Sequence, residues 1–219
     1  MPAVMQRPSL VRAVEVPAGT IYAPEVPGAY LIVHGRLRFI HVTDEGHTVA
    51  TGVLGADEAI LVRRPWLPGS PSGYVEAFEY SRLLGVRERD VAEMVARRPD
   101  FAAAVVHALM RQAGDLVEAM CDLALTDARE RVLRTLIRLA ERHGEASPDD
   151  DFVRIAIPLR HEDLATLVGT CRETVTSVLA DLTRAGAVRN GRASIAVSRE
   201  RAIALLEAFH EDRRRDASA

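Results

Sequence analysis

The apolar positions of residues 159–186 predict two short helices that meet at a glycine. In both helices apolar residues recur at steps of three and four, the spacing of the buried face of an amphipathic helix. These residues are Leu164, Ala165, Leu167 and Val168 in the first helix, and Val175, Val178, Leu179 and Leu182 in the second. Gly169 suits a left-handed turn between the two, and residues 171–174 open the second helix. The pattern indicates a helix-turn-helix.

The second helix carries polar side chains at the outward positions that alternate with its buried ones. They are Arg172, Glu173, Thr176 and Ser177. In a helix-turn-helix, such side chains contact base edges in the major groove of DNA. An ordinary helical hairpin without a DNA role has the same apolar pattern, so the pattern alone leaves both interpretations open.

The residues of this corner resemble the recognition-helix motif of the cyclic-AMP receptor protein and fumarate-nitrate regulator (CRP/FNR) family of bacterial transcription factors. The matching residues are Gly169, the Arg-Glu-Thr-Val run at 172–175, Leu179, Leu182 and Gly186. The resemblance implies that Arg172 reads a guanine and Glu173 a cytosine, which agrees with the hydrogen-bonding capacity of these side chains. Ser177 stands where many relatives carry a further arginine, so we expect relaxed or altered specificity at the outer base that this position would read.

The residues after Gly186 predict a β-hairpin, the wing of a winged helix. Asn190 and Gly191 lie between two short alternating runs and favour a type I′ turn, because both turn positions need positive φ. Arg189 and Arg192 flank the expected tip. They are candidates for contacts with backbone phosphates, with a purely structural hairpin as the alternative.

The flanking segments complete the order of a winged helix, which is also the order of the C-terminal half of the resembled family. Asp127 and Glu130 have the spacing of a capping box at the start of an amphipathic helix. The expected elements are this helix to residue 143, an acidic loop over 145–151, a strand over 152–157, and a last helix from 199 to about 210 with a frayed tail.

Residues 99–125 predict one long helix with a wide apolar arc. Two rows of residues follow it at alternating steps of three and four, the coiled-coil spacing. The rows are Ala102, Val105, Leu109, Gln112, Leu116, Ala119, Leu123, and Val106, Leu109, Ala113, Leu116, Met120, Leu123. We expect one side to pack on the N-terminal domain and the other on a second copy of the chain. The predicted dimer contacts are Val105, Leu109, Gln112, Leu116, Ala119, Met120 and Leu123, with burial inside one chain as the alternative.

Residues 10–90 predict short strands separated by turns. The apolar and β-branched runs are 31–35, 36–42, 48–54 and 74–86, and the turns contain Pro17-Ala-Gly, Pro27-Gly, Asp44-Glu-Gly and residues 68–73. Many short strands with frequent turns indicate a sandwich or jelly roll. The turns at 34–37, 44–46 and 54–57 resemble those of the sensory domain of the same family. The chain is therefore expected to be α+β, with a jelly-roll domain over 1–97, a dimerisation helix over 98–125 and a winged helix over 126–219.

The nucleotide-binding signature of the resembled family is missing from this sequence. Cyclic-nucleotide-binding members carry a Gly-Glu pair and, after a short loop, an arginine that meets the cyclic phosphate. Residues 57–77 contain no Gly-Glu pair, and Ser72-Gly-Tyr stands where the arginine is expected. A cyclic phosphate would lose its charge-assisted partner, so cyclic AMP is not an expected cofactor. Substitution by Arg63 or Arg64 is the alternative.

The composition and charge of the chain limit the kinds of partner that it could bind. All 28 basic residues are arginine and the net charge is -3, so a DNA-binding face requires a local arrangement of arginines. No apolar run approaches the ~20 residues of a membrane-spanning helix. The N-terminus lacks the layout of a secretion signal, so we expect a cytoplasmic protein with no membrane partner. Cys121 and Cys171 fall in different predicted domains, which argues against an internal disulfide.

Other sensing chemistry is weakly supported. His34, His41 and His47 fall in neighbouring predicted strands without the spacing of a zinc motif. Cys121 is a candidate redox switch or a small buried apolar residue, and Trp66 covers either a pocket or a core edge. No nucleophile with its base, and no phosphate-binding glycine loop, supports catalysis, so no enzyme activity and no cofactor is expected.

These observations predict a homodimeric, sequence-specific DNA-binding transcription regulator. Its partners would be double-stranded DNA, a second copy of itself and, if it is an activator, RNA polymerase. The residues predicted to contact DNA are Arg160, Glu162, Thr170, Arg172, Glu173, Thr176, Ser177, Arg189 and Arg192. Two rivals are a cupin-like metal or small-molecule protein whose C-terminal helices only oligomerise, and an adaptor that has lost DNA binding.

Overall fold

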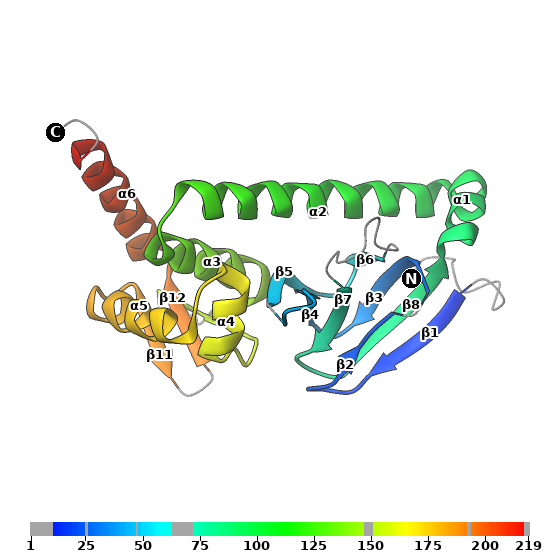
Figure 1. Ribbon diagram of the computed structural model, residues 1–219, viewed down its shortest axis with the longest axis horizontal. Coiled ribbons are helices and arrows are strands. Elements are labelled where there is room, and N and C mark those ends of the chain that lie inside the picture. Colours follow the sequence, from blue (N-terminus) through cyan, green and yellow to red (C-terminus); the bar gives the residue numbers. More distant parts are fainter. Residues whose placement is uncertain are drawn as a thin grey trace. The chain divides into compact units, whose positions relative to one another are not determined.

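The computed structural model describes residues 11–24, 26–46, 48–62, 72–146, 151–191 and 194–216. The chain divides into two compact units, residues 1–119 and 120–219, whose elements are labelled in Figure 1. Within the described ranges, no helix has the length and apolar character needed to cross a membrane.

In the part of the N-terminal unit that the structure describes, the strands form two antiparallel sheets of four. The strands are β1 (Val11–Val16), β2 (Ile21–Tyr22), β3 (Gly28–His34), β4 (Leu37–Val42), β5 (Thr48–Leu54), β6 (Ala59–Val62), β7 (Ser72–Ala77) and β8 (Ser81–Arg87). Their order is β1-β8-β3-β6 in one sheet and β2-β7-β4-β5 in the other. Apart from the β4–β5 hairpin, consecutive strands alternate between the two sheets, as in a jelly roll, which confirms the predicted fold class.

The core of this unit is formed by alternate residues of the strands. Ile32, Leu37, Ile60, Val75 and Leu83 are each at most 1% exposed and belong to one apolar cluster. Because successive side chains of a strand point to opposite faces, the sheet β1-β8-β3-β6 also has an outer face. On β3 that face carries Ala29 and Leu31.

Several elements of this unit differ from the sequence prediction. The single run expected over 74–86 is two strands, because the chain passes from one sheet at β7 to the other at β8. Strands β1, β2 and β6 and the helix α1 (Glu88–Arg97) were not predicted individually. Helix α1 has few apolar residues, and its buried Met94 packs in a small cluster with Val86 and Phe101.

Helix α2 spans Pro99–Leu125, as predicted. In its first half, Ala108 is buried, and the Gln112 side chain donates to the carbonyl of Ala59 on β6 at 2.9 Å. One face of α2 therefore packs on its own sheet. Large apolar side chains remain exposed elsewhere along the helix: Val106, Leu109, Met110, Leu116, Val117, Met120, Leu123 and Leu125.

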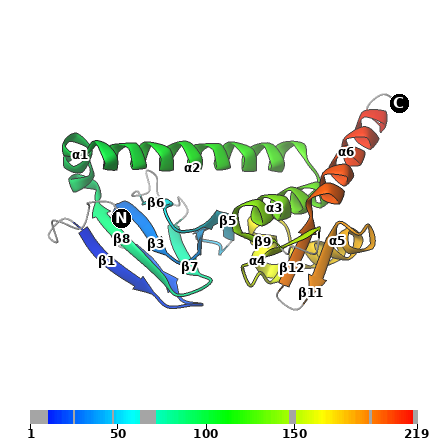
Figure 2. The same ribbon diagram turned by 180° about the vertical axis from the view of Figure 1, so that it is seen from behind.

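The C-terminal unit combines helices with a small antiparallel sheet. Its elements are the end of α2, α3 (Ala128–His143), β9 (Gly144–Ala146), β10 (Phe152–Ile155), α4 (His161–Val168), α5 (Arg172–Arg184), β11 (Val188–Gly191), β12 (Ser194–Ser198) and α6 (Arg199–Asp216). The sheet order is β11-β12-β10-β9, and Figure 2 shows its edge strand β9, which the sequence prediction treated as loop.

A buried carboxylate connects α3 to α6. Glu130 is 1% exposed, and its Oε1 accepts from Arg134 at 2.8 Å and lies 3.0 Å from Nε2 of His210. Arg213 also binds Glu130 and donates to the carbonyl of Leu125 at 2.8 Å. These contacts explain why α6 continues to Asp216, where the sequence predicted a frayed tail.

The predicted hairpin is present, but its turn was misplaced. Asn190 pairs with Ile195 and Gly191 with Ser194, so both predicted turn residues lie in β11. This register places Val188 opposite Val197, and both side chains are buried. A turn at 190–191 would break that apolar pair, so burial decides the register over local turn preference.

The corner between α4 and α5 gives a test of the fold. Gly169 has φ of +64°, and a Cβ there would lie 3.0 Å from Cδ2 of Leu123. Gly169→Ala should therefore lower the free energy of unfolding by about 1–3 kcal/mol. Gly114 in α2 has open space at its Cβ. As the matched control, Gly114→Ala should raise stability by roughly 0.5–1 kcal/mol. Chemical denaturation followed by circular dichroism measures both, and an unchanged Gly169→Ala protein would contradict a strained turn.

Candidate DNA interface

Buried side chains fix the direction of α5. Val175, Leu179 and Leu182 are fully buried and Val178 nearly so, and α5 packs on both α3 and α4. Gly169 closes α4 in the left-handed conformation, as predicted. Packing of one face of α5 therefore determines which residues its opposite face presents to solvent.

Arg131 holds the corner from α3, a role that the sequence analysis missed. Its Nε donates to the carbonyl of Val168, the last residue of α4, at 3.0 Å, and its Nη1 donates to the carbonyl of Thr126 at 2.6 Å. The last carbonyls of a helix lack partners within it. Arg131 thus satisfies one of them and connects α4 to the start of α3.

The outward residues of α5 are accessible. Arg172, Glu173, Thr176 and Ser177 are all exposed. Within the described ranges, Arg172 forms no ion pair, whereas Arg184 at the other end of α5 binds Asp181 at 2.8 Å. The guanidinium of Arg172 therefore retains its full set of donors for an external acceptor.

His161 links the three elements of the interface. The Asn190 amide nitrogen of β11 lies 3.3 Å from His161 Nε2, and His161 Nδ1 lies 2.9 Å from the Thr176 hydroxyl. The Thr176 hydroxyl donates to the carbonyl of Arg172 at 2.9 Å. If the Asn190 amide donates to Nε2, then Nδ1 of His161 carries the proton and donates to the Thr176 hydroxyl, which in turn donates to the Arg172 carbonyl. Each donor in this chain then has an acceptor. No sequence motif marked this histidine, because its partners are 15 and 29 residues away.

The first helix contributes polar groups beside this face. Arg160 and Glu162 are exposed at the start of α4, and the Arg160 backbone N–H donates to the buried Asp163 at 2.8 Å. Thr170 is half-buried at the corner, where its N–H donates to the carbonyl of Ala165. Asp163 is therefore a capping residue, while the side chains of Arg160 and Glu162 extend into solvent.

The wing contributes Arg189 from β11. Its side chain is exposed, and the guanidinium carbon lies 3.8 Å from the centre of the Phe152 ring on β10. This contact orients the guanidinium while leaving it accessible. Arg192 lies outside the described residues.

Comparison with known proteins identifies the family. The Crp-like helix-turn-helix domain matches residues 130–209. The cyclic AMP receptor protein of Thermus thermophilus is 30% identical over 81% of this chain and 77% of its own length. The chain belongs to the CRP/FNR family. The CRP-like cAMP-activated global transcriptional regulator of Mycobacterium tuberculosis is 26% identical to this CRP/FNR protein, over 86% of this chain and 84% of its own.

Solved structures of CRP/FNR regulators share the fold. A CooA mutant from Carboxydothermus hydrogenoformans matches with a TM-score of 0.74 and 21% identity, over 92% of this chain and 88% of that chain. FixK2 from Bradyrhizobium japonicum matches with a TM-score of 0.71 and 18% identity, over 89% of this chain and 96% of that chain. The protein is a DNA-binding transcription regulator of the CRP/FNR type, and the cupin-like alternative is not favoured.

The histidines and cysteines considered as sensors in this CRP/FNR regulator do not form a cluster among the described residues. His41 packs edge-on against Phe39 and burial lowers its pKa, whereas His34 lies beside Tyr80. His47, Arg63, Arg64 and Trp66 lie outside the described residues. Over the described ranges, no group of three or more His, Cys, Asp or Glu side chains could hold a metal ion. Cys121 and Cys171 are both free thiols.

Cys171, the residue before α5, gives a chemical test of this geometry. The hydrogen bond with the Thr174 hydroxyl, together with that of the Thr174 backbone, lowers the pKa of the exposed Cys171 thiol. More thiolate is then present at neutral pH. In a Cys121→Ser background, Thr174→Val should shift the pH profile of iodoacetamide alkylation to higher pH, and Thr174→Ser should preserve it. Identical profiles for Thr174→Val and the parent would rule out the hydroxyl as the cause.

Proposed function

We propose that this CRP/FNR regulator binds two-fold symmetric promoter sites as a homodimer, with α5 in the major groove and without a requirement for cyclic AMP. The observation that carries the proposal is the division of α5 into a buried apolar face and an exposed face with Arg172 and Glu173. DNA binding, and contact with RNA polymerase if it activates transcription, would place the protein in the bacterial cytoplasm.

The chemistry of the exposed face supports direct base recognition. Arginine donates two hydrogen bonds to O6 and N7 of guanine, and glutamate accepts from the amino group of cytosine. Arg172 and Glu173 are adjacent in the first turn of α5, the end of a recognition helix that contacts bases. Ser177 lies one turn further and is too short to span a guanine edge with two hydrogen bonds. Each half-site should therefore contain a G·C step, with weaker preference at the outer base.

The first functional test compares Arg172 with Arg189. Arg172→Ala should weaken binding to the specific DNA site by about 1–3 kcal/mol and should remove the sequence preference at one base pair. Arg189→Ala, in the wing, should lower the affinity for all DNA sequences alike. It should also reduce the slope of the logarithm of the binding constant against the logarithm of the salt concentration by about one. Affinities for a panel of single-base variants at two salt concentrations measure both effects. If Arg172→Ala weakens every sequence equally, Arg172 contacts phosphate and the proposed orientation of α5 is wrong.

The exposed apolar side chains of α2 support the homodimer. Leu109, Leu116, Met120 and Leu123, all predicted dimer contacts, are 48–68% exposed and recur at coiled-coil spacing. Two other predicted contacts face their own domain, because Gln112 binds the Ala59 carbonyl and Val105 lines a cavity against the sheet. We therefore propose that the dimer seam follows the row with Leu109, Leu116, Met120 and Leu123, and that Val105 and Gln112 lie at its edge.

A charged residue at the centre of this seam should separate the copies. Leu116→Glu places an unpaired carboxylate in an apolar contact and should weaken the dimer strongly. Gly114→Glu is the matched control, because residue 114 is roughly 160° around the helix from residue 116 and its Cβ meets open space. Sedimentation equilibrium at micromolar concentrations should show monomer for Leu116→Glu and dimer for Gly114→Glu. A dimeric Leu116→Glu protein would exclude the seam.

The proposal of cyclic-AMP independence rests on the sequence. Residues 57–77 contain neither the Gly-Glu pair nor the arginine that binds the cyclic phosphate in relatives. Two relatives are named for cyclic AMP, so this chain would differ from them in its signal.

Titration calorimetry gives the direct test of this difference. Cyclic AMP added to the full-length protein should produce no heat of binding, and the affinity for DNA should be the same with and without the nucleotide. Micromolar binding would contradict the proposal, and its loss in an Arg63→Ala, Arg64→Ala double variant would identify the substitute arginines.

A further inference from the structure

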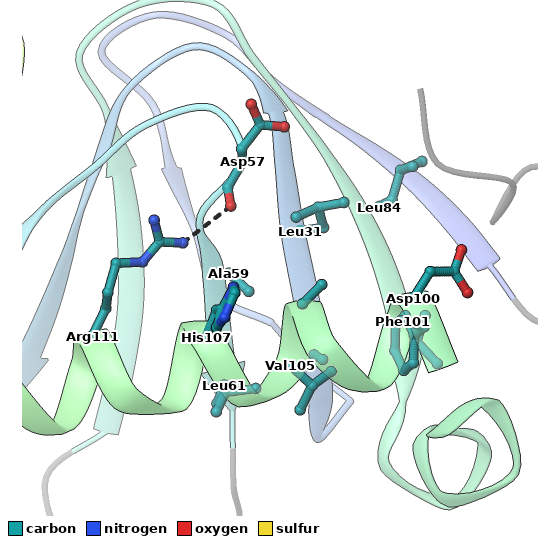
Figure 3. A pocket seen from close by; sticks show the side chains of 13 residues that line it. Leu31, Asp57, Ala59, Leu61, Leu84, Asp100, Phe101, Val105, His107 and Arg111 are labelled. Atoms are coloured by element: carbon teal, nitrogen blue, oxygen red, sulfur yellow. Dashed lines mark hydrogen bonds between the residues drawn. The ribbon is translucent and has the colours of Figure 1, made fainter. Parts of the chain in front are cut away.

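The N-terminal unit contains a cavity of about 280 Å³ between the outer face of the sheet β1-β8-β3-β6 and the first half of α2 (Figure 3). Its lining includes three neighbouring strands, β3, β6 and β8, on one side and α2 on the other. The core residues Tyr30, Ile32, Ile60 and Leu83 point to the opposite side of the same sheet. The cavity is therefore separate from the space between the two sheets.

The sheet side of the cavity is an apolar floor of two rows. Strand pairing aligns Leu61, Ala29 and Val86 in one row and Ala59, Leu31 and Leu84 in the next. The α2 side adds Phe101, Ala104 and Val105. The alanines of the floor and of α2 leave the space that larger side chains would fill. An apolar cavity with few polar groups is the usual form of a small-molecule site.

One end of the cavity carries a positive group. Arg111 on α2 lines it, and its Nη2 donates to the backbone carbonyl of Asp57 at 3.2 Å, while the Asp57 carboxylate points away (Figure 3). Within the described ranges, Arg111 pairs with this neutral carbonyl and with no carboxylate, so the charge of the guanidinium is not balanced there. His107, one turn earlier on α2, lines the same cavity.

The acidic group near the other end is already paired. Asp100 accepts from Arg98 at 2.8 and 3.2 Å, and the Arg98 interaction lowers its pKa. The cavity therefore combines an apolar interior with a guanidinium at one end. A carboxylate is the planar partner that a guanidinium binds with two parallel hydrogen bonds.

We propose that this cavity binds a small monocarboxylate with an apolar body, with the carboxylate at Arg111 and the apolar part between Leu31, Leu84 and Phe101. Sodium octanoate is the probe, and octan-1-ol is its uncharged counterpart of equal chain length. All measurements use the full-length protein without DNA, so their outcome does not depend on the proposed DNA binding.

Titration calorimetry and methyl NMR test the proposal together. Octanoate should bind, and the methyl signals that shift should be those of Leu31, Leu61, Leu84 and Val105. Arg111→Gln should lower the affinity for octanoate about tenfold or more, since it removes a charge-assisted contact. The affinity for octan-1-ol should stay within about twofold of that of the parent protein. Arg97→Gln is the control, because Arg97 is exposed on α1 and pairs with Glu93, and this variant should bind octanoate like the parent.

A second variant tests the cavity itself. Ala104→Trp should fill the space and abolish binding of both probes, while circular dichroism shows whether the fold is retained. Absence of octanoate binding to the parent protein, shifts confined to methyl groups outside the cavity, or equal weakening of both probes by Arg111→Gln would each overturn the proposal.

Discussion

Burial of one face of α5 is the constraint on which the proposed DNA-binding activity depends. Leaving a side chain such as Val175 or Leu179 in water instead of the core costs about 1.5–3 kcal/mol, and both are fully buried. The helix can therefore satisfy its apolar stripe in only one rotation. That rotation exposes Arg172 and Glu173, and the left-handed turn at Gly169 sets the angle at which α5 leaves α4. The proposed base recognition is in this sense a consequence of packing.

The same alternation of faces organises the N-terminal unit. One face of the sheet β1-β8-β3-β6 closes the jelly-roll core, and the other forms an apolar floor beneath α2. Helix α2 uses a second face, with Leu109 and Leu116, for the proposed dimer seam. A CRP/FNR regulator without the cyclic-phosphate signature still has a hollow beside its long helix. Arg111 contributes a guanidinium to that hollow, which favours a ligand with an acid group.

Sequence periodicity was sufficient where burial alone decides the structure. The rows of α4 and α5, the bounds of α2 and the jelly-roll class were all predicted, because each reflects a regular alternation of apolar and polar positions. Periodicity failed to predict the structure where contacts between residues far apart in the sequence determine it. Asn190-Gly191 favours a turn locally, but the pairing of Val188 with Val197 moves the turn. The length of α6 depends on Arg213 reaching Glu130, which lies 83 residues earlier. His161 was missed for the same reason, since its partners come from another helix and from the wing.

The central claim is that two copies of this chain present α5 to successive turns of DNA. Selection of bound sequences from a pool of random duplexes tests it most directly. The account predicts an enriched inverted repeat, with a G·C step in each half and half-site centres about 34 Å apart, one turn of B-DNA. Enrichment of a single unpaired half-site would contradict the dimer, and the absence of any enriched sequence would contradict base recognition by Arg172 and Glu173.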